Sequence, residues 1–284
     1  MRSKLFVPGS RPELFAKAYA GEADAVSFDL EDSVPAERKA GAREAVAGFL
    51  REQAGVVARK CTVVRTNPPG SAEFVHDLRA LLGAGVDLLN LPRIESPEQV
   101  VEAVALIERI EAELGLPAGP RLLLNIETPR GLLAAAAIAA AHPRVAGLQL
   151  GLGDLFEPYG IARDEPGHVR AAMYTVAMAA AAAGVYACDS AHPDYTSEAA
   201  FEREARMSQR LGFVGKSCIH PRQVAWANRI YMPDAGELEW ARRVKAAARE
   251  AAARGQAAFS VDGRMVDPPY LRRAERLLAM AGEA

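Results

Sequence analysis

Residues 122–154 read LLLNIETPRGLLAAAAIAAAHPRVAGLQLGLGD, and this stretch contains one complete strand–helix–strand unit. Apolar runs at 122–126 and 147–150 have the length and composition of buried strands, and the alanine-rich segment between them favours a helix. An acid follows each strand, Glu127 directly and Asp154 after a short glycine-containing turn. Because the carboxyl ends of parallel strands meet at one rim, both carboxylates are expected there.

The same strand–helix alternation extends through most of the chain. Runs with strand character occur at 4–7, 25–30, 61–66, 88–91, 122–126, 147–150, 185–188 and 214–219, separated by segments with helical patterning. Eight such repeats favour an α/β fold of the closed (β/α)8 TIM barrel type over an open doubly wound sheet. No Gly-x-Gly-x-x-Gly follows the first strand, which argues against a dinucleotide-binding fold. We therefore expect a TIM barrel catalytic domain over residues 1–233.

The pattern changes over residues 234–284. A charged helix-like stretch at 235–254 is followed by two short apolar runs around an Asp262-Gly263 turn, which is a hairpin signal. Pro268-Pro269 then precedes a final helix. A closed barrel has no edge that could accept further strands, so this segment is expected to form a C-terminal helical and hairpin extension. Its expected role is that of a lid, covering a barrel mouth or packing on a neighbouring subunit.

Composition excludes several classes of protein. The chain has 284 residues, 50% of them hydrophobic, and a formal net charge of −2, so no basic surface indicates a nucleic-acid partner. The alanine-rich stretches at 132–141 and 171–184 are too short or too interrupted to cross a membrane. Three cysteines without C-x-x-C spacing are typical of small core residues in a reducing compartment, so we expect a cytoplasmic protein. Gly-x-Ser-x-Gly and P-loop motifs do not occur.

Glu127 and Asp154 are the candidate metal ligands. Two carboxylates on neighbouring units of one rim offer hard oxygen ligands and leave room for water and substrate, which suits Mg²⁺. The alternative is that each acid caps the following helix or pairs with an arginine such as Arg130. Their joint occurrence favours the metal.

Further charged residues are expected on the same rim. Arg65 ends a buried strand-like run, where its guanidinium either binds a substrate carboxylate or enolate oxygen, or pairs with Glu31 or Asp32. Glu31 and Asp32 lie beside Asp29; one of these acids can cap the next helix, while the others hydrogen-bond metal-bound waters. Arg11, Lys39 and Lys216 are candidate phosphate partners, with a solvated side chain or a core ion pair as the alternative.

Short motifs in this order along nearly the whole chain resemble the citrate lyase beta-subunit-like family of the HpcH/HpaI aldolase/citrate lyase superfamily. The matching motifs are LFVPGSRP (5–12), FDLEDSV (28–34), VRTN (64–67), LPRIES (91–96), IETPRG (126–131), GDL (153–155), GFVGKSCIHP (212–221) and VDGRMVD (261–267). The VDGRMVD segment favours the branch of the family that acts on coenzyme A thioesters. One departure is Gly153, where many relatives have an acid.

The resemblance implies a TIM barrel, Mg²⁺ and reversible carbon–carbon cleavage of a 3-hydroxyacyl thioester. It places the metal ligands on Glu127 and Asp154 and the substrate arginine on Arg65. It also implies that Asp267 serves as acid/base in the active site of a neighbouring subunit, within a homotrimer. From the sequence alone, the alternative for Asp267 is a cap of the last helix.

The predicted activity is therefore that of a Mg²⁺-dependent carbon–carbon lyase. Its expected substrate is an acyl-CoA of the citramalyl-CoA or malyl-CoA type, cleaved to acetyl-CoA and a 2-keto acid. One alternative is the beta subunit of citrate lyase, acting on citryl carried by an acyl carrier protein. Others are a malate synthase or thioesterase activity on the same scaffold, or a barrel that has lost its chemistry.

Overall fold

A computed structural model describes residues 1–57 and 60–283 of the chain. Eight parallel strands form a closed barrel in which β1 pairs with β2 on one side and β8 on the other. The strands are β1 (Ser3–Pro8), β2 (Ala25–Asp29), β3 (Cys61–Arg65), β4 (Leu88–Leu91), β5 (Arg121–Ile126), β6 (Val145–Leu150), β7 (Tyr186–Asp189) and β8 (Gly215–Cys218). The predicted (β/α)8 barrel is confirmed, with all eight strands at their expected places in the sequence.

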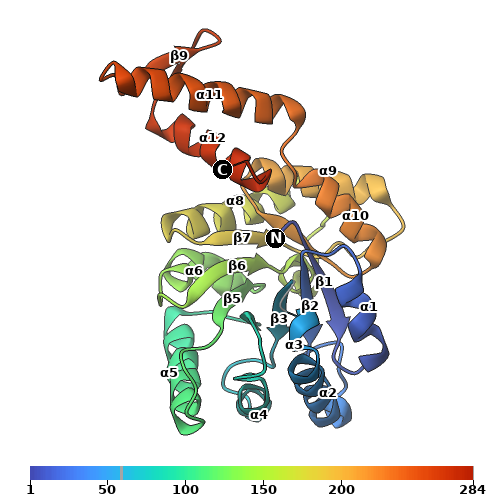
Figure 1. The fold of residues 1–284 in the computed structure, drawn as a ribbon. Coiled ribbons are helices and arrows are strands. Elements are labelled where there is room, and N and C mark those ends of the chain that lie inside the picture. The colour runs from blue at the N-terminus through green and yellow to red at the C-terminus, as the bar shows by residue number, and fades with distance from the viewer. Residues whose placement is uncertain (58–59, 284) are drawn as a thin grey trace. The chain divides into compact units, whose positions relative to one another are not determined.

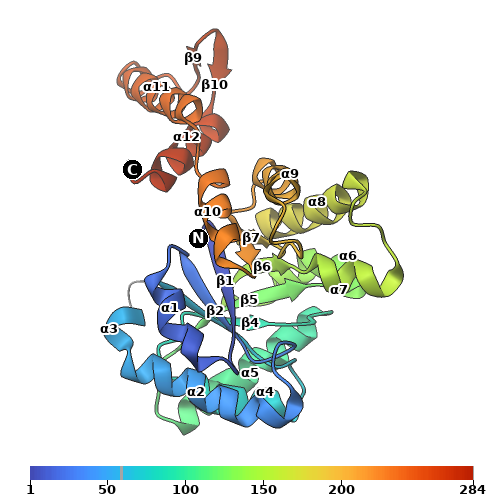
Figure 2. The ribbon, with the colours of Figure 1, turned by 90° about the vertical axis from the view of Figure 1, so that its right-hand side faces the viewer.

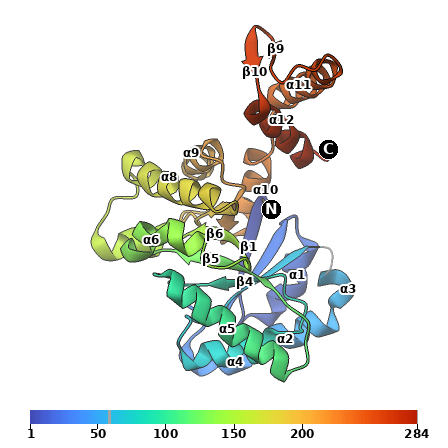
Figure 3. The same cartoon turned by 90° about the vertical axis from the view of Figure 1, so that its left-hand side faces the viewer.

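Helices connect the strands and lie outside the barrel, as the three ribbon views show (Figures 1, 2 and 3). They are α1 (Phe15–Ala20), α2 (Lys39–Glu52), α3 (Ala54–Val57), α4 (Ala72–Leu81), α5 (Pro97–Glu113), α6 (Pro129–Ala139), α7 (Leu152–Phe156), α8 (Pro166–Ala182), α9 (Glu198–Arg210) and α10 (Pro221–Ile230). Serine or threonine caps several of their amino ends; Ser71, Ser96 and Thr128 each accept a hydrogen bond from a backbone amide of the following turn. No described helix is long and apolar enough to cross a membrane.

The C-terminal residues form a second compact unit, Ile230–Ala284, after a first unit of Met1–Arg229. It contains α11 (Ala235–Ala253), the antiparallel pair β9 (Phe259–Val261) and β10 (Arg264–Val266), and α12 (Pro268–Met280). Asp262 and Gly263 both have positive φ angles, 53° and 73°. A two-residue hairpin turn of type I′ requires this at its two central positions. This C-terminal unit has its own hydrophobic core, to which β9 contributes Val261 and β10 contributes Val266. The predicted helix–hairpin–helix order of this segment is confirmed.

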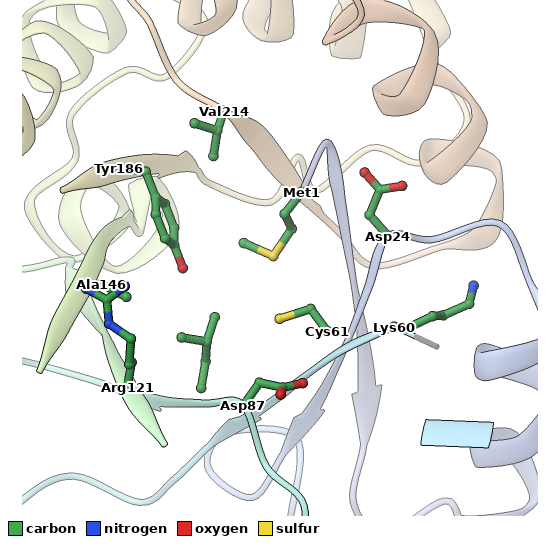
Figure 4. Close-up of a pocket in the computed structure, with 10 residues that line it drawn as sticks. Met1, Asp24, Lys60, Cys61, Asp87, Arg121, Ala146, Tyr186 and Val214 are labelled. Atoms are coloured by element: carbon green, nitrogen blue, oxygen red, sulfur yellow. The ribbon is translucent and has the colours of Figure 1, made fainter. Parts of the chain in front are cut away.

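A cavity of about 770 Å³ opens at the end of the barrel where the strands begin. Cys61, Arg121 and Tyr186 come from the first residues of their strands and point into it (Figure 4). Asp24 and Asp87 in its wall have intramolecular partners, the side chain of Arg2 and the amide of Thr62. In TIM barrels chemistry is found at the opposite end, so this cavity is not the candidate active site.

A lysine is fully buried inside the barrel. Nζ of Lys4 on β1 lies 3.4 Å from Oδ1 of Asn90 on β4. Because β4 is not a sheet neighbour of β1, which pairs with β2 and β8, this contact crosses the barrel interior. Its ammonium also lies 4.5 Å from the centre of the Phe6 ring. Burial lowers the pKa of Lys4 to about 8, because the charged form loses its hydration.

This shift predicts a pH dependence of stability. A lysine with a lowered pKa binds fewer protons in the folded protein than in the unfolded chain, so its contribution to stability rises with pH. Between pH 8 and 10.5, the free energy of unfolding should rise by about 3 kcal/mol more in the wild type than in a Lys4→Met protein. Urea unfolding of both proteins at several pH values measures this difference. If the difference in unfolding free energy between the two proteins stays constant over this pH range, the lowered pKa of Lys4 is contradicted.

Candidate active site

The candidate site is a cavity of about 280 Å³ at the end of the barrel where the strands finish. Its wall brings together three predicted residues from separate parts of the sequence: Arg65 at the end of β3, Glu127 just after β5, and Asp154 in the first turn of α7. The convergence expected of a parallel barrel therefore holds for these three side chains.

Glu127 is buried and held by two hydrogen bonds. Its Oε1 accepts from the backbone amide of Arg93 at 2.8 Å, and its Oε2 accepts from Nδ2 of Asn125 at 2.8 Å. Arg93 has a φ of 55°, an uncommon conformation for a residue other than glycine, directly where its amide meets the carboxylate. Burial raises the pKa of Glu127, and the nearby charge of Asp154 acts in the same direction.

The alternative in which Glu127 caps the next helix is wrong. The cap of α6 is Thr128, whose Oγ1 accepts from the amide of Gly131 at 3.0 Å. Glu127 instead lines the cavity, where each carboxylate oxygen keeps a second lone pair beyond the hydrogen bond that it accepts. Asp154 is exposed at the amino end of α7, beside the same cavity.

These two carboxylates fit a magnesium ion. Among the described residues, no group of three or more histidine, cysteine or acidic side chains is arranged to enclose a metal. Mg²⁺ does not need such a group, since it is usually held by one or two carboxylates and keeps several ligands from water or substrate. A buried, hydrogen-bonded glutamate facing an exposed aspartate is a donor set of this kind.

Gly151 allows the approach of the chain to Glu127. A Cβ at Gly151 would lie 2.5 Å from Cβ and 2.7 Å from Oε2 of Glu127, whereas a Cβ at Gly153 would have no neighbour within 4 Å. We therefore expect Gly151→Ala to displace the carboxylate and to weaken Mg²⁺ binding by about tenfold or more. Gly153→Ala is the matched control and should bind as the wild type does. Calorimetric titration with Mg²⁺ distinguishes the two; equal affinities would contradict this account.

Arg65 forms ion pairs with nearby acids and also lines the cavity. Its Nε and Nη2 each donate to Asp29 at 2.7 Å, and its Nη1 lies 3.1 Å from Glu31 and 3.4 Å from Asp32. These contacts raise the pKa of the guanidinium, which burial alone would lower. The predicted ion pairs with Glu31 and Asp32 are thus present, and Arg65 also lines the cavity.

Asp29 is the partner of Arg65 that sequence reasoning missed. It is buried at the end of β2 and also accepts hydrogen bonds from the amides of Glu31 and Ser33. Three acids within four residues gave no sign of which one would meet Arg65. The register that pairs Asp29 with Arg65 across β2 and β3 supplies that information.

Glu31 and Asp32 differ in their surroundings. Glu31 is buried, and within the described part of the chain neither carboxylate oxygen has a hydrogen bond of good geometry, although Arg65 and Arg93 each approach to 3.1 Å. Burial raises the pKa of Glu31 to about 8 despite these two cations. Asp32 is exposed and lies 3.2 Å from Arg93. Because the two Glu31 oxygens accept no hydrogen bond of good geometry from the described residues, they can still accept one from a water or a ligand.

A buried ion cluster supports the other side of the cavity. Lys216 on β8 donates to Asp189 at 2.7 Å and to Glu204 at 2.6 Å, and Glu204 also pairs with Arg163 in the cavity wall at 2.8 Å. Lys216 has no exposed surface, so its assignment as a phosphate partner is wrong and its core ion pair is confirmed. Sequence reasoning missed Arg163, whose loop gives no strand-end signal.

The other two candidate phosphate partners also have intramolecular contacts. Lys39 donates to the carbonyls of Leu30 and Glu31 and to Oδ1 of Asn67, and Arg11 pairs on the surface with Glu13. Lys39 is thereby tied to the loop that carries Glu31, while Arg11 remains exposed.

Asp267 lies in the C-terminal unit, at the residue before α12. Its side chain makes no capping hydrogen bond, and its buried Oδ1 has no partner among the described residues. The alternative in which Asp267 caps the last helix through its side chain is therefore wrong. A buried carboxylate oxygen without a partner needs another explanation.

Fold and cavity together define a TIM-barrel protein whose strand ends carry a pair of carboxylates and an anchored arginine, as in metal-dependent enzymes of this fold. The chain belongs to the HpcH/HpaI aldolase/citrate lyase family, whose model matches residues 2–221. The family resemblance of the sequence motifs is thus confirmed.

Relatives of known activity match almost the whole chain. The citrate lyase subunit beta of Escherichia coli (strain K12) is 37% identical, with 99% of this chain and 93% of that protein covered. The L-malyl-CoA/beta-methylmalyl-CoA lyase of Cereibacter sphaeroides (strain ATCC 17029 / ATH 2.4.9) is 32% identical, with 99% and 94% covered. A solved structure of CitE from Mycobacterium tuberculosis, in complex with magnesium, acetoacetate and coenzyme A, has a TM-score of 0.76 and 37% identity, with 100% of both chains covered. The first two relatives are carbon–carbon lyases, the predicted class.

Proposed function

We propose that this protein is a Mg²⁺-dependent carbon–carbon lyase that cleaves a 3-hydroxyacyl-CoA of the citramalyl-CoA or malyl-CoA type to acetyl-CoA and a 2-keto acid. The observation that carries the proposal is the convergence of Glu127, Asp154 and Arg65 on one cavity at the strand ends. Relatives that act on malyl-CoA, or that bind magnesium and coenzyme A, support the same chemistry.

Glu127 and Asp154 would hold the metal ion in this proposal. Bound there, Mg²⁺ supplies positive charge that polarises the carboxylate and hydroxyl oxygens of a 2-hydroxy acid. Glu127 is fixed by its two hydrogen bonds, so it presents its free lone pairs without first reorganising. Glu31, whose oxygens form ion pairs but accept no hydrogen bond of good geometry within the described part of the chain, and Asp32 would accept hydrogen bonds from waters on the metal.

Arg65 would stabilise the charge that develops on the thioester side. In the cleavage the hydroxyl proton leaves to a base, the carbon–carbon bond breaks, and its electron pair becomes a thioester enolate. Arg65 is held in place by Asp29, so its charge is directed at the cavity before the enolate forms. Asp267 would then return a proton to the enolate carbon, which completes acetyl-CoA.

Asp267 belongs to the C-terminal extension, which we propose acts as the lid of a neighbouring subunit's active site in a homotrimer. Its unpartnered Oδ1 supports a role outside its own helix. The proposed partners are the acyl-CoA and the 2-keto acid, and the proposed location is the cytoplasm.

The beta subunit of citrate lyase is the second candidate function. It is favoured by the match to the Escherichia coli subunit over 99% of this chain. The two candidates differ in the carrier of the thioester, which is coenzyme A in one and an acyl carrier protein in the other.

One assay tests these candidates. The purified protein is incubated with Mg²⁺ and, separately, malyl-CoA, citramalyl-CoA, citryl-CoA and citryl-carrier protein, and the released keto acid and free thiol are followed. Keto acid with acetyl-CoA supports the lyase. Free coenzyme A with no keto acid would instead indicate a thioesterase, and no cleavage of any thioester would reject the proposal.

A further inference from the structure

A chain of buried polar side chains leads through the barrel interior to Glu127. Interiors of TIM barrels are filled mainly by branched apolar residues, yet here Lys4, Asn90 and Asn125 lie inside with at most 3% of their surface exposed. Burial of an ammonium and two amides costs free energy unless each is hydrogen-bonded. Their arrangement therefore needs an explanation beyond core packing.

The hydrogen bonds that link these four side chains all run in one direction, from Lys4 as donor toward Glu127 as acceptor. Nζ of Lys4 donates to Oδ1 of Asn90 at 3.4 Å, and Nδ2 of Asn90 donates to Oδ1 of Asn125 at 2.6 Å. Nδ2 of Asn125 then donates to Oε2 of Glu127 at 2.8 Å. Each asparagine accepts on the side of Lys4 and donates on the side of Glu127.

The two ends determine this direction. An asparagine amide can present either its oxygen or its nitrogen to a neighbour, whereas an ammonium only donates and a carboxylate only accepts. Lys4 therefore requires the oxygen of Asn90, and the carbonyl of Leu123, 3.0 Å from Nδ2, favours the same orientation. The nitrogen of Asn90 then requires the oxygen of Asn125, which leaves the nitrogen of Asn125 for Glu127.

From this geometry we infer that Lys4 is a positioning residue for Glu127, acting through Asn90 and Asn125 to keep an N–H donor on Oε2 and the remaining lone pairs toward the cavity. Lys4 does not line the cavity, and its hydrogen bond is to Asn90. The inference rests on the proposed function, because it takes Glu127 as a ligand of the divalent cation. It adds a determinant of metal affinity on the first strand, far in sequence from the candidate ligands.

The test measures binding of Mn²⁺, in place of Mg²⁺, from the EPR signal of the free ion. Lys4→Met removes every donor and should weaken Mn²⁺ binding by about tenfold, and Asn125→Leu should weaken it at least as much. Lys4→Arg keeps a cationic donor that is long enough to reach Asn90 and should retain more Mn²⁺ affinity than Lys4→Met. Val63→Ala, which removes buried apolar surface from the cluster near the start of the strands, serves as the control for lost stability.

The outcomes separate this inference from the proposed function. Unchanged affinity in Lys4→Met and Asn125→Leu, with binding abolished by Glu127→Gln, would overturn the inference and leave the metal site standing. Unchanged binding in Glu127→Gln would instead remove the metal site. Equal weakening in Val63→Ala would show that stability, not position, controls affinity and would also overturn the inference. If Lys4→Met does not fold, Asn90→Leu breaks the same chain and decides the question.

Discussion

The Glu127→Gln protein is expected to lose lyase turnover by roughly 10³-fold or more, together with most of its Mg²⁺ affinity. Glutamine has nearly the same shape as glutamate and can still accept the hydrogen bond from the Arg93 amide. It removes the negative charge, and only Asp154 then remains as an anionic ligand in the proposed site. The amide nitrogen of the glutamine then faces the donating Nδ2 of Asn125, so the loss of turnover is assigned to the metal where thermal unfolding is unchanged.

The measurement is keto-acid release as a function of Mg²⁺ concentration, alongside thermal unfolding. Glu113→Gln is the matched control, because Glu113 ends the outer helix α5 and its ion pair with Arg79 is exposed. The control should keep full turnover. A Glu127→Gln protein within tenfold of the wild type, with the same Mg²⁺ dependence, would refute the role given to this carboxylate.

The Asp267→Asn protein should lose turnover by about 10²-fold to 10⁴-fold while its Mg²⁺ affinity stays unchanged. Asparagine cannot return a proton to the enolate carbon, but it leaves the candidate metal site intact. Because the Asp267 side chain makes no capping hydrogen bond, the unfolding free energy should change by less than about 0.5 kcal/mol. Asp262→Asn is the control: Asp262 is an exposed acid in the same unit, and asparagine tolerates its positive φ.

Mixed oligomers test whether Asp267 acts on a neighbouring subunit. Glu127→Gln and Asp267→Asn proteins are each expected to be nearly inactive. In trimers reassembled from equal amounts, about a quarter of the sites would combine an intact barrel with an intact tail from the neighbour, and activity should return to that fraction. No recovery in verified mixed trimers would place Asp267 in its own subunit's site or outside catalysis. A monomer by light scattering would reject the trimer itself.

Tertiary structure changed the interpretation of the candidate site more than that of the fold. The place of Glu127 beside the cavity was predictable because two acids that follow neighbouring parallel strands converge on one rim of the barrel. Asp29 was not, since its importance depends on the register between β2 and β3. Lys216 illustrates the same limit: from the sequence it was a candidate phosphate partner, with a core ion pair as the alternative, and its two acidic partners come from β7 and α9.

The barrel, the order of its strands and the residues that finish each strand could be predicted from the amino-acid sequence. These features follow from local periodicity, which a short stretch of chain contains completely. The folded structure was needed to show that Thr128 rather than Glu127 caps α6, that Asp29 anchors Arg65, and that Lys4 is linked to Glu127 through two amides. Each of these depends on distances and hydrogen-bond directions set by the folded chain, often between strands far apart in the sequence. Periodicity specifies which face a side chain takes, but not which partner it meets there.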